Sequence, residues 1–208
     1  MKRSYFLLFA VFCLLFSAFL WGCGDSGSGS PGSHGSEDTG VILDATIVPT
    51  YNGTDTSSVD AFQDTCSGGT AEIFTDHSAT VTINATLLNP NTTFQPGILY
   101  VEKYTITYFR STDSIGSPPI GSDTRFATIV IDPPTGTGIT TVTDTVEFLD
   151  ITRKLNYWTD VTSGQYTART LNNYTAVYTF EGKNQFDELF SFTVQKDFQI
   201  GNFNNCGG

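Results

Sequence analysis

Residues 80–87, TVTINATL, carry the clearest indication of the fold. Their odd positions are apolar, and their even positions are threonine or asparagine. Successive side chains of a β-strand point to opposite faces, so this alternation over eight residues is typical of a strand with one face in a core and the other in water. The stretch therefore predicts a β-strand that is buried on one side.

The same alternation recurs along the chain from Val41 onward. Clear runs cover residues 103–108, 174–180 and 190–200, weaker ones cover 126–130 and 142–148, and two further candidates are Val41–Val48 and Ala71–Phe74. Seven to nine strands with one wet face each are typical of an antiparallel β-sandwich. We therefore predict an all-β fold, with helix limited to one or two turns within residues 150–158.

The connections between these strands are also indicated by composition. Residues 181–188 contain Gly, Asn and Asp between two apolar runs, which predicts the turn of a hairpin between the last two strands. Residues 49–70 and 111–122 are rich in turn-forming residues and lack periodicity, so we expect both to be long loops.

Lys196 falls among the inward positions of the last predicted strand. Two interpretations are open: a β-bulge at Lys196–Asp197 resets the register, or the lysine reaches solvent at a sheet edge. We expect the bulge, because Phe198 and Ile200 continue the apolar face beyond it.

Residues 171–174, LNNY, lead into the strand-like stretch TAVYTF. This arrangement resembles the tyrosine corner of immunoglobulin-like and fibronectin type III sandwiches, over roughly residues 70–205. The resemblance implies an immunoglobulin-like sandwich in which the Tyr174 hydroxyl bonds back to the preceding connection. The central tryptophan and the cysteine pair of antibody domains are absent from the sequence, so no immunoglobulin function is implied.

The start of the chain has the features of an export signal. Lys2 and Arg3 precede an apolar run over residues 5–20, which is the usual order of a signal peptide. The run is also just long enough to cross a bilayer, so a retained membrane helix is the alternative. We expect cleavage because of the residues that follow the run.

Residues 20–23, LWGC, resemble the lipobox of bacterial lipoproteins, from which Trp21 departs because that position is usually small. The resemblance implies that residues 1–22 are removed and that Cys23 is lipidated. It places the protein in the bacterial cell envelope, outside the cytoplasm, held to a membrane by acyl chains on Cys23. Whether that is the inner or the outer membrane stays open.

The sequence thus divides into three parts. After the signal peptide (1–22), residues 23–40 comprise the cysteine and a stretch with six glycines, five serines and no aliphatic side chain, which predicts a flexible, disordered tether. Residues 41–208 are long enough for one domain with a sizeable core.

Two cysteines remain once Cys13, within the apolar run, and the lipidation site Cys23 are set aside. Cys66 and Cys206 are expected to form a disulfide in an oxidising compartment, closing a loop of about 140 residues. The alternative is a pair of buried free thiols.

The formal charge of −11 becomes −13 when Lys2 and Arg3 leave with the signal peptide. This charge argues against nucleic acid as a partner and against electrostatic docking on anionic lipid headgroups. It suits a solvated protein of the cell envelope.

No catalytic or metal-binding motif is present. The sequence lacks HExxH, CxxC, GxSxG, GxGxxG and Walker patterns, and His77 is the only histidine after the tether. We expect His77 in a surface turn, and we predict no catalytic residue, no metal site and no cofactor. Loop calcium is the alternative that the abundant Asp, Asn and carbonyl oxygens leave open.

Three aromatic residues are the best candidates for ligand binding: Tyr157, Trp158 and Tyr166. Flat aromatic faces can serve as apolar platforms for sugar rings. The alternative for Trp158 is that it covers one open end of the core.

These observations predict a non-catalytic, lipid-anchored envelope protein whose β-sandwich acts in adhesion, scaffolding or envelope-complex assembly, with an unidentified protein or polysaccharide partner. Segments such as VTINATLLNPN and VEKYTITYFRS resemble lipid-anchored bacterial envelope proteins without assigned function. The second hypothesis is a carbohydrate-binding module that uses the aromatic residues. The third is a hydrolase with two carboxylates, which no motif would reveal.

Overall fold

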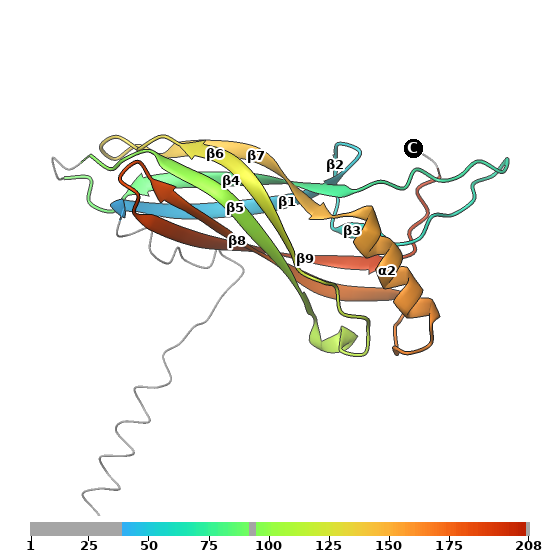
Figure 1. Ribbon diagram of the computed structural model, residues 1–208. Coiled ribbons are helices and arrows are strands. Elements are labelled where there is room, and N and C mark those ends of the chain that lie inside the picture. Colours follow the sequence, from blue (N-terminus) through green and yellow to red (C-terminus); the bar gives the residue numbers. More distant parts are fainter. Residues whose placement is uncertain (1–38, 92–94, 207–208) are drawn as a thin grey trace, which may run out of the picture.

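Two β-sheets packed against each other form the body of the protein (Figure 1). The computed structural model describes residues 39–91 and 95–206, so the predicted signal peptide, Cys23 and most of the predicted tether lie outside the described residues. In spatial order, the first sheet contains β2 (Thr54–Asp55), β1 (Val41–Tyr51), β4 (His77–Leu87) and β7 (Thr140–Leu149). The second contains β3 (Ser58–Asp60), β9 (Leu189–Gly201), β8 (Leu171–Asn184), β5 (Leu99–Arg110) and β6 (Asp123–Ile131).

The predicted all-β sandwich is confirmed, with nine strands in the described part of the chain. All of their pairings are antiparallel except the short parallel pairing of β3 with β9. The strand order is β1-β4-β7 in one sheet and β9-β8-β5-β6 in the other. This is the arrangement of immunoglobulin-like sandwiches, in which the strands of one chain are divided between two packed sheets.

The stretch at residues 80–87 lies in the middle of the first sheet. Val81, Ile83 and Ala85 are fully buried, and Thr82 on the outer face lies between Thr46 of β1 and Thr143 of β7. Burying a large aliphatic side chain contributes roughly 1.5–3 kcal/mol. The alternation therefore determines which face of this sheet meets the other.

Aromatic side chains fill much of the space between the sheets. Phe198 of β9 contacts Phe148 edge-on at 5.0 Å between ring centroids, and it stacks on Tyr174 at 5.8 Å. The hydroxyls of the buried tyrosines reach carbonyls of β7 and of the connection between β5 and β6. Each ring thus supplies apolar area while its polar atom stays hydrogen-bonded.

Tyr174 has the structural role implied by the tyrosine corner, but with a different acceptor. Its hydroxyl donates to the carbonyl of Pro118 at 2.5 Å and lies 2.5 Å from Ser117 Oγ. Both partners belong to the connection between β5 and β6, whereas the expected acceptor was in the connection that precedes β8. The reason is that a helix occupies the preceding connection and packs Tyr157 edge-on against Tyr174.

That helix, α2 (Ile151–Thr162), is longer than the one or two turns expected. The Asp150 side chain caps it by accepting from the backbone N–H of Arg153 at 2.7 Å, and α2 carries the chain from β7 in one sheet to β8 in the other. Two other expectations were wrong. Ala71–Phe74 is not a strand and makes only an isolated bridge from Ala71 to Thr65, and the 49–70 loop includes the short strands β2 and β3.

No bulge occurs at Lys196–Asp197. The pairing of β9 with β8 runs without a shift from Leu189 to Gly201, so Lys196 stays on the inward side and is half-buried. Because β3 pairs only with residues 199–201 of β9, Lys196 lies where β9 has no strand on its other side within the described residues. The lysine at a sheet edge was therefore the correct alternative.

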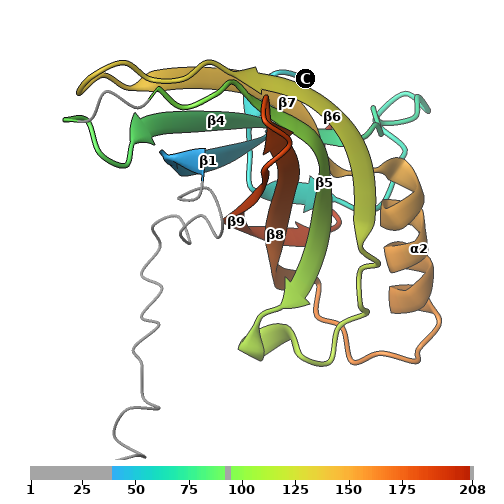
Figure 2. The same cartoon turned by 60° about the vertical axis from the view of Figure 1, so that its left-hand side comes forward.

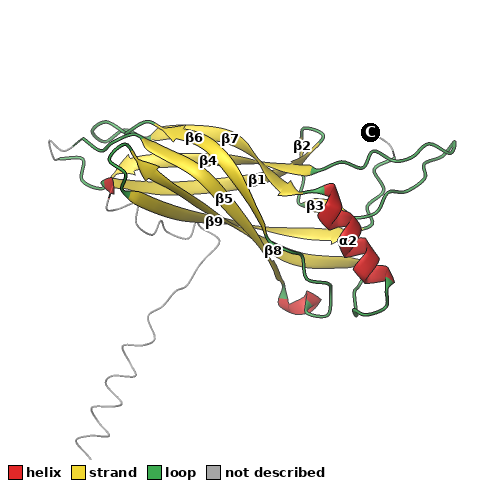
Figure 3. Ribbon diagram, in the orientation of Figure 1, coloured by secondary structure: helices red, strands yellow, loops and turns green. Residues whose placement is uncertain are grey.

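The sandwich has two distinct ends (Figures 1 and 2). We call the tether end the one where Thr39 leads into β1; it carries the connections 88–98 and 132–139 and the turn 185–188. The far end carries the connections 52–57, 61–76 and 111–122, the helix α2 and residues 202–206 (Figure 3). No helix among the described residues is long and apolar enough to span a membrane.

Candidate binding site

A groove of about 560 Å³ opens at the far end between the β1–β2 turn and residues 202–206. Its lining mixes polar and apolar side chains, including Tyr51, Asn52, Ile73 and Phe203. The Tyr51 hydroxyl donates to the carbonyl of Ile73 at 2.5 Å, which ties two walls of the groove together. Ile73 itself is 56% exposed, so the groove presents an apolar side chain beside amides.

A tight turn shapes one wall. Asn52 and Gly53 both have positive φ angles, 49° and 76°, and they link Tyr51 to Thr54 in a two-residue hairpin. An Asn-Gly pair is the strongest short-range signal for such a hairpin. The Asn-Gly pair in the sequence therefore indicated this hairpin, which the prediction of a 49–70 loop missed.

Below the groove, two basic side chains are buried against aromatic rings. His77 is stacked on Tyr51 with 4.4 Å between ring centroids, and its Nε2 lies 3.3 Å from the carbonyl oxygen of Ser58. Lys154 of α2 donates from Nζ to the carbonyl of Thr75. The same ammonium lies 4.7 Å from the centroid of the Phe74 ring, a cation–π distance. The buried His77 thus supports the ring of Tyr51 from below the groove.

His77 was expected in a surface turn, and this expectation was wrong. It is the first residue of β4 and only 1% exposed, because Tyr51 and the 58–76 segment cover it. Burial, together with the nearby Lys154 charge, lowers the pKa of His77 to about 3, so the ring is neutral at pH 7. Among the described residues its Nδ1 has no hydrogen-bond partner and its Nε2 meets a carbonyl, so the ring is paired with no nucleophile.

Two buried carboxylates hold residues 202–206 in place. Asp60 accepts from the backbone N–H of Phe203 at 3.0 Å, and Glu72 accepts from that of Asn205. Burial raises the pKa of Asp60, although the hydrogen bonds that it accepts from the backbone N–H groups of Phe203 and Phe62 oppose the shift. Because Phe203 and Asn205 line the groove, the two carboxylates position its second wall.

The predicted disulfide is confirmed at the same place. Cys66 and Cys206 are bonded, with 5.3 Å between their Cα atoms and a sequence separation of 140. The bond joins the 61–76 connection to residues 202–206. The carboxylates of Asp60 and Glu72 hold the same residues 202–206 by hydrogen bonds. The far end is therefore held by covalent and hydrogen-bonded contacts.

The three predicted aromatic residues do not form one platform. Tyr157 is 2% exposed and its hydroxyl accepts from Asn172 Nδ2 at 2.8 Å, so it belongs to the core. Trp158 is half-buried and its ring lies 4.8 Å from that of Phe62, while Tyr166 is half-buried in the connection after α2. Phe62 was not predicted, because nothing in the sequence relates it to a residue 96 positions later.

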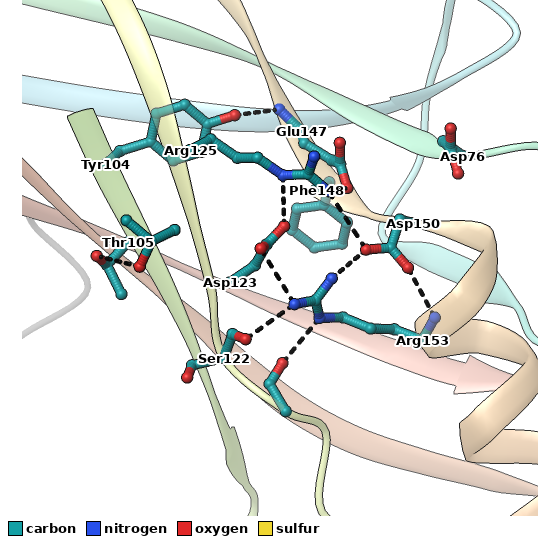
Figure 4. Close-up of polar contacts among 12 residues, drawn as sticks. Asp76, Tyr104, Thr105, Ser122, Asp123, Arg125, Glu147, Phe148, Asp150 and Arg153 are labelled. Atoms are coloured by element: carbon teal, nitrogen blue, oxygen red, sulfur yellow. Dashed lines mark hydrogen bonds and ion pairs between the residues drawn. The ribbon is translucent and has the colours of Figure 1, made fainter. Parts of the chain in front are cut away.

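Three carboxylates gather beside α2 (Figure 4). Oxygen atoms of Asp123, Glu147 and Asp150 lie within 4.8 Å of one another, the closest approach to a cation site among the described residues. Arg125 contacts all three, at 2.6 Å, 2.8 Å and 3.5 Å respectively, and Arg153 contacts Asp123 at 3.1 Å and also Asp150. Two guanidinium groups thus already pair with the carboxylates that would have to bind a calcium ion.

This network joins the two sheets. Asp123 and Arg125 belong to β6, Glu147 belongs to β7, and Arg153 of α2 also donates to the carbonyls of Gly121 and Ser122. None of the three carboxylates lines the groove described above. The geometry therefore favours ion pairing between sheets over a pair of catalytic carboxylates facing a substrate.

The chain has no match to any known protein-family model, and no curated protein matches it. The residues of the far end are therefore interpreted from their own contacts. They form a rigid, partly apolar surface, in which sequence reasoning had identified Trp158 and the disulfide but had missed Lys154, Phe62 and the buried carboxylates.

Acidification is expected to destabilise the protein through His77. The unfolded histidine binds a proton near pH 6.5 and the folded one only near pH 3, so the folded state loses stability as the pH falls through this window. Between pH 7 and pH 4, protonation of His77 in the unfolded chain should lower the free energy of unfolding by roughly 3 kcal/mol. Asp60 acts in the opposite direction, because its pKa is raised in the folded state and protonation there favours folding.

Urea unfolding of the wild type and of His77→Phe between pH 4 and pH 7 isolates the histidine from Asp60. The variant keeps a ring against Tyr51 and should lose less stability on acidification. Parallel pH dependences in the two proteins would contradict the burial of a neutral His77.

Proposed function

We propose that this protein is a lipid-anchored component of the bacterial cell envelope, acylated at Cys23, whose β-sandwich binds a partner protein at its far end without catalysing a reaction. In this proposal the acyl chains supply location and the sandwich supplies recognition. Confinement near a membrane raises the local concentration of the site for a partner in the same compartment, so a modest affinity is sufficient.

The observation that carries this proposal is the separation of the two ends. The chain reaches the sandwich at Thr39, and the groove, α2 and the disulfide lie at the opposite end (Figure 1). The eleven residues of β1 span about 35 Å at roughly 3.3 Å per residue. Anchoring at Cys23 would thus leave the most elaborately supported surface free for a partner.

The chemistry of the far end indicates the kind of partner. Ile73 and Leu155 are more than half exposed, and the ring contact of Trp158 with Phe62 adds aromatic area at this end. Interfaces commonly combine such apolar anchors with a polar rim. Exposed carboxylates such as Asp55 in the groove favour a partner with basic groups around its apolar contacts.

A polysaccharide is the second candidate. The half-buried Trp158, supported from one side by Phe62, is the observation that favours it, since a supported indole can stack on a sugar ring. The burial of Tyr157 removes one of the three rings expected for such a platform.

Site-specific photo-cross-linking in intact cells tests the proposal. A photoreactive residue at Leu155, 52% exposed on α2, should yield adducts with one protein, whereas the same residue at Thr143 on the outer face of β7 should yield none. Adducts that lose mass only on glycosidase treatment would support the polysaccharide. Equal adduct patterns at the two positions would contradict a binding site at the far end.

A further inference from the structure

We propose that the tether end of the sandwich docks directly on the lipid surface, through an apolar rim formed by Tyr100, Val130, Phe186 and Leu189. The proposal rests on anchoring at Cys23, as put forward above, and adds a second membrane contact made by the folded domain. It would orient the far end away from the lipid.

Three of the rim residues belong to a row that crosses four strands, in which β8 contributes the charged Lys183. Val130 of β6 pairs with Tyr100 of β5, Tyr100 pairs with Lys183 of β8, and Lys183 pairs with Leu189 of β9. These residues form one row on the outer face of the second sheet, next to the turn that carries Phe186. The exposed fractions are 44% for Val130, 36% for Tyr100, 58% for Phe186 and 77% for Leu189. A row of exposed apolar side chains marks a surface that meets another apolar surface.

Other connections at this end also carry exposed apolar residues. Leu88 follows β4 and is 49% exposed, and Ile139 precedes β7 and is 66% exposed. Both lie at the same end of the molecule as the 185–188 turn in Figures 1 and 2. The exposed side chains therefore extend from the second sheet to the first.

The turn that displays Phe186 is well ordered. The side-chain oxygen of Asn184 accepts from the backbone N–H groups of Phe186 at 2.9 Å and Glu188 at 3.0 Å, and Gln185 donates from its backbone to Ile98. A Cβ atom at Gly97 would lie only 2.9 Å from Phe186 Cε2, so glycine allows the ring to rest against the backbone there. A preorganised turn loses little conformational entropy when its apolar tip inserts.

Charged groups beside the rim contact one another or a neighbouring amide. Lys183 donates to Asp187 at 2.8 Å and lies 4.0 Å from Glu102, while Glu188 accepts from the Asn184 amide at 2.6 Å. Carboxylates outnumber lysine in this group, so attraction to anionic lipid is not the driving force. We infer a contact driven by apolar burial, which is insensitive to salt on zwitterionic membranes and weaker on anionic membranes, where salt should screen the repulsion.

The length of chain before the sandwich makes this contact possible. Sixteen residues, 23–38, precede Thr39 and can span at most about 55 Å, at roughly 3.3–3.6 Å per residue. That reach exceeds the length of β1, so the tether alone would let either end face the lipid. The apolar rim, placed at the end where the chain enters, decides the orientation.

Tryptophan quenching in vesicles tests the proposal with the full lipidated chain. Trp158 at the far end is the only tryptophan after Cys23, so it serves as the control, and the double variant Phe186→Trp with Trp158→Phe places the probe in the rim. In phosphatidylcholine vesicles with brominated acyl chains, we expect the rim probe to lose emission and shift to the blue, while the wild type changes little. Adding Leu189→Glu to the double variant should restore the emission without changing flotation with the vesicles.

Three results would overturn the proposal in distinguishable ways. A chain that floats with vesicles while both probes remain equally unquenched would refute the docking and leave the anchoring intact. A chain that does not float at all would refute the anchoring and the docking with it. If the rim probes stay unquenched and lie close together in a dimer, the rim binds a second copy of the chain and not the lipid.

Discussion

Replacing Cys23 with serine is expected to abolish the lipid anchoring of this protein. Only the cysteine thiol can carry the acyl group that the lipobox implies, and each buried methylene contributes about 0.8 kcal/mol of membrane affinity. Two or three chains therefore hold a protein stably, whereas the acidic domain alone has no electrostatic attraction to anionic lipid. We expect the variant in the soluble fraction or retained as a precursor.

Fractionation and mass spectrometry measure this effect. The wild type should begin with an acylated Cys23, and Cys13→Ser should behave like the wild type because Cys13 lies within the segment that cleavage removes. An intact Met1 in the membrane fraction, for the wild type and Cys23→Ser alike, would show instead that the apolar run is retained as a membrane helix.

Removing the disulfide should give the largest loss of folding stability. The bond links two positions 140 apart in sequence and restricts the unfolded chain strongly, so replacing Cys66 and Cys206 with serine should lower the free energy of unfolding by about 3–5 kcal/mol. Urea unfolding measures this difference. Reductant should shift the wild type to the variant's midpoint and leave the variant unchanged.

Hydrogen exchange locates the effect within the native state. The backbone N–H groups of Phe203 and Asn205 donate to Asp60 and Glu72, so their exchange should accelerate in the cysteine variant. The paired amides in the middle of β8 and β9 should stay protected. Two alkylatable thiols in the native, oxidised wild type would contradict the bond itself.

The core strands could be predicted because their signal is local. Val81, Ile83 and Ala85 are buried as their alternation with polar residues indicated, since one strand needs only one apolar face. The disulfide was equally accessible, because setting aside Cys13 and Cys23 left a single pair. Lys196 shows the limit of such reasoning: a single polar residue on the inward face suggested a bulge, whereas a free sheet edge accommodates the lysine without one.

The far end could not be predicted in the same way. His77 appeared to belong to a surface turn, and only the packing of Tyr51 and the 58–76 segment over it made it a buried neutral ring. Lys154 has no distinctive neighbours in the sequence, yet the packing of α2 against the rest of the fold places its ammonium beside the ring of Phe74. Long-range contacts of this kind leave no periodic trace in the sequence.

By itself, the sequence determined the all-β sandwich class of fold with seven to nine strands, the pairing of Cys66 with Cys206 and the expectation of a lipid anchor at Cys23. These properties depend on local alternation, on a count of cysteines and on one contiguous motif. Only the tertiary structure decided that Phe62 meets Trp158, that Arg125 and Arg153 form ion pairs with three carboxylates, and that the groove and the apolar rim lie at opposite ends. The physical reason is that sheet order and loop packing, which bring distant residues together, depend on the energy of the whole core and not on any single stretch.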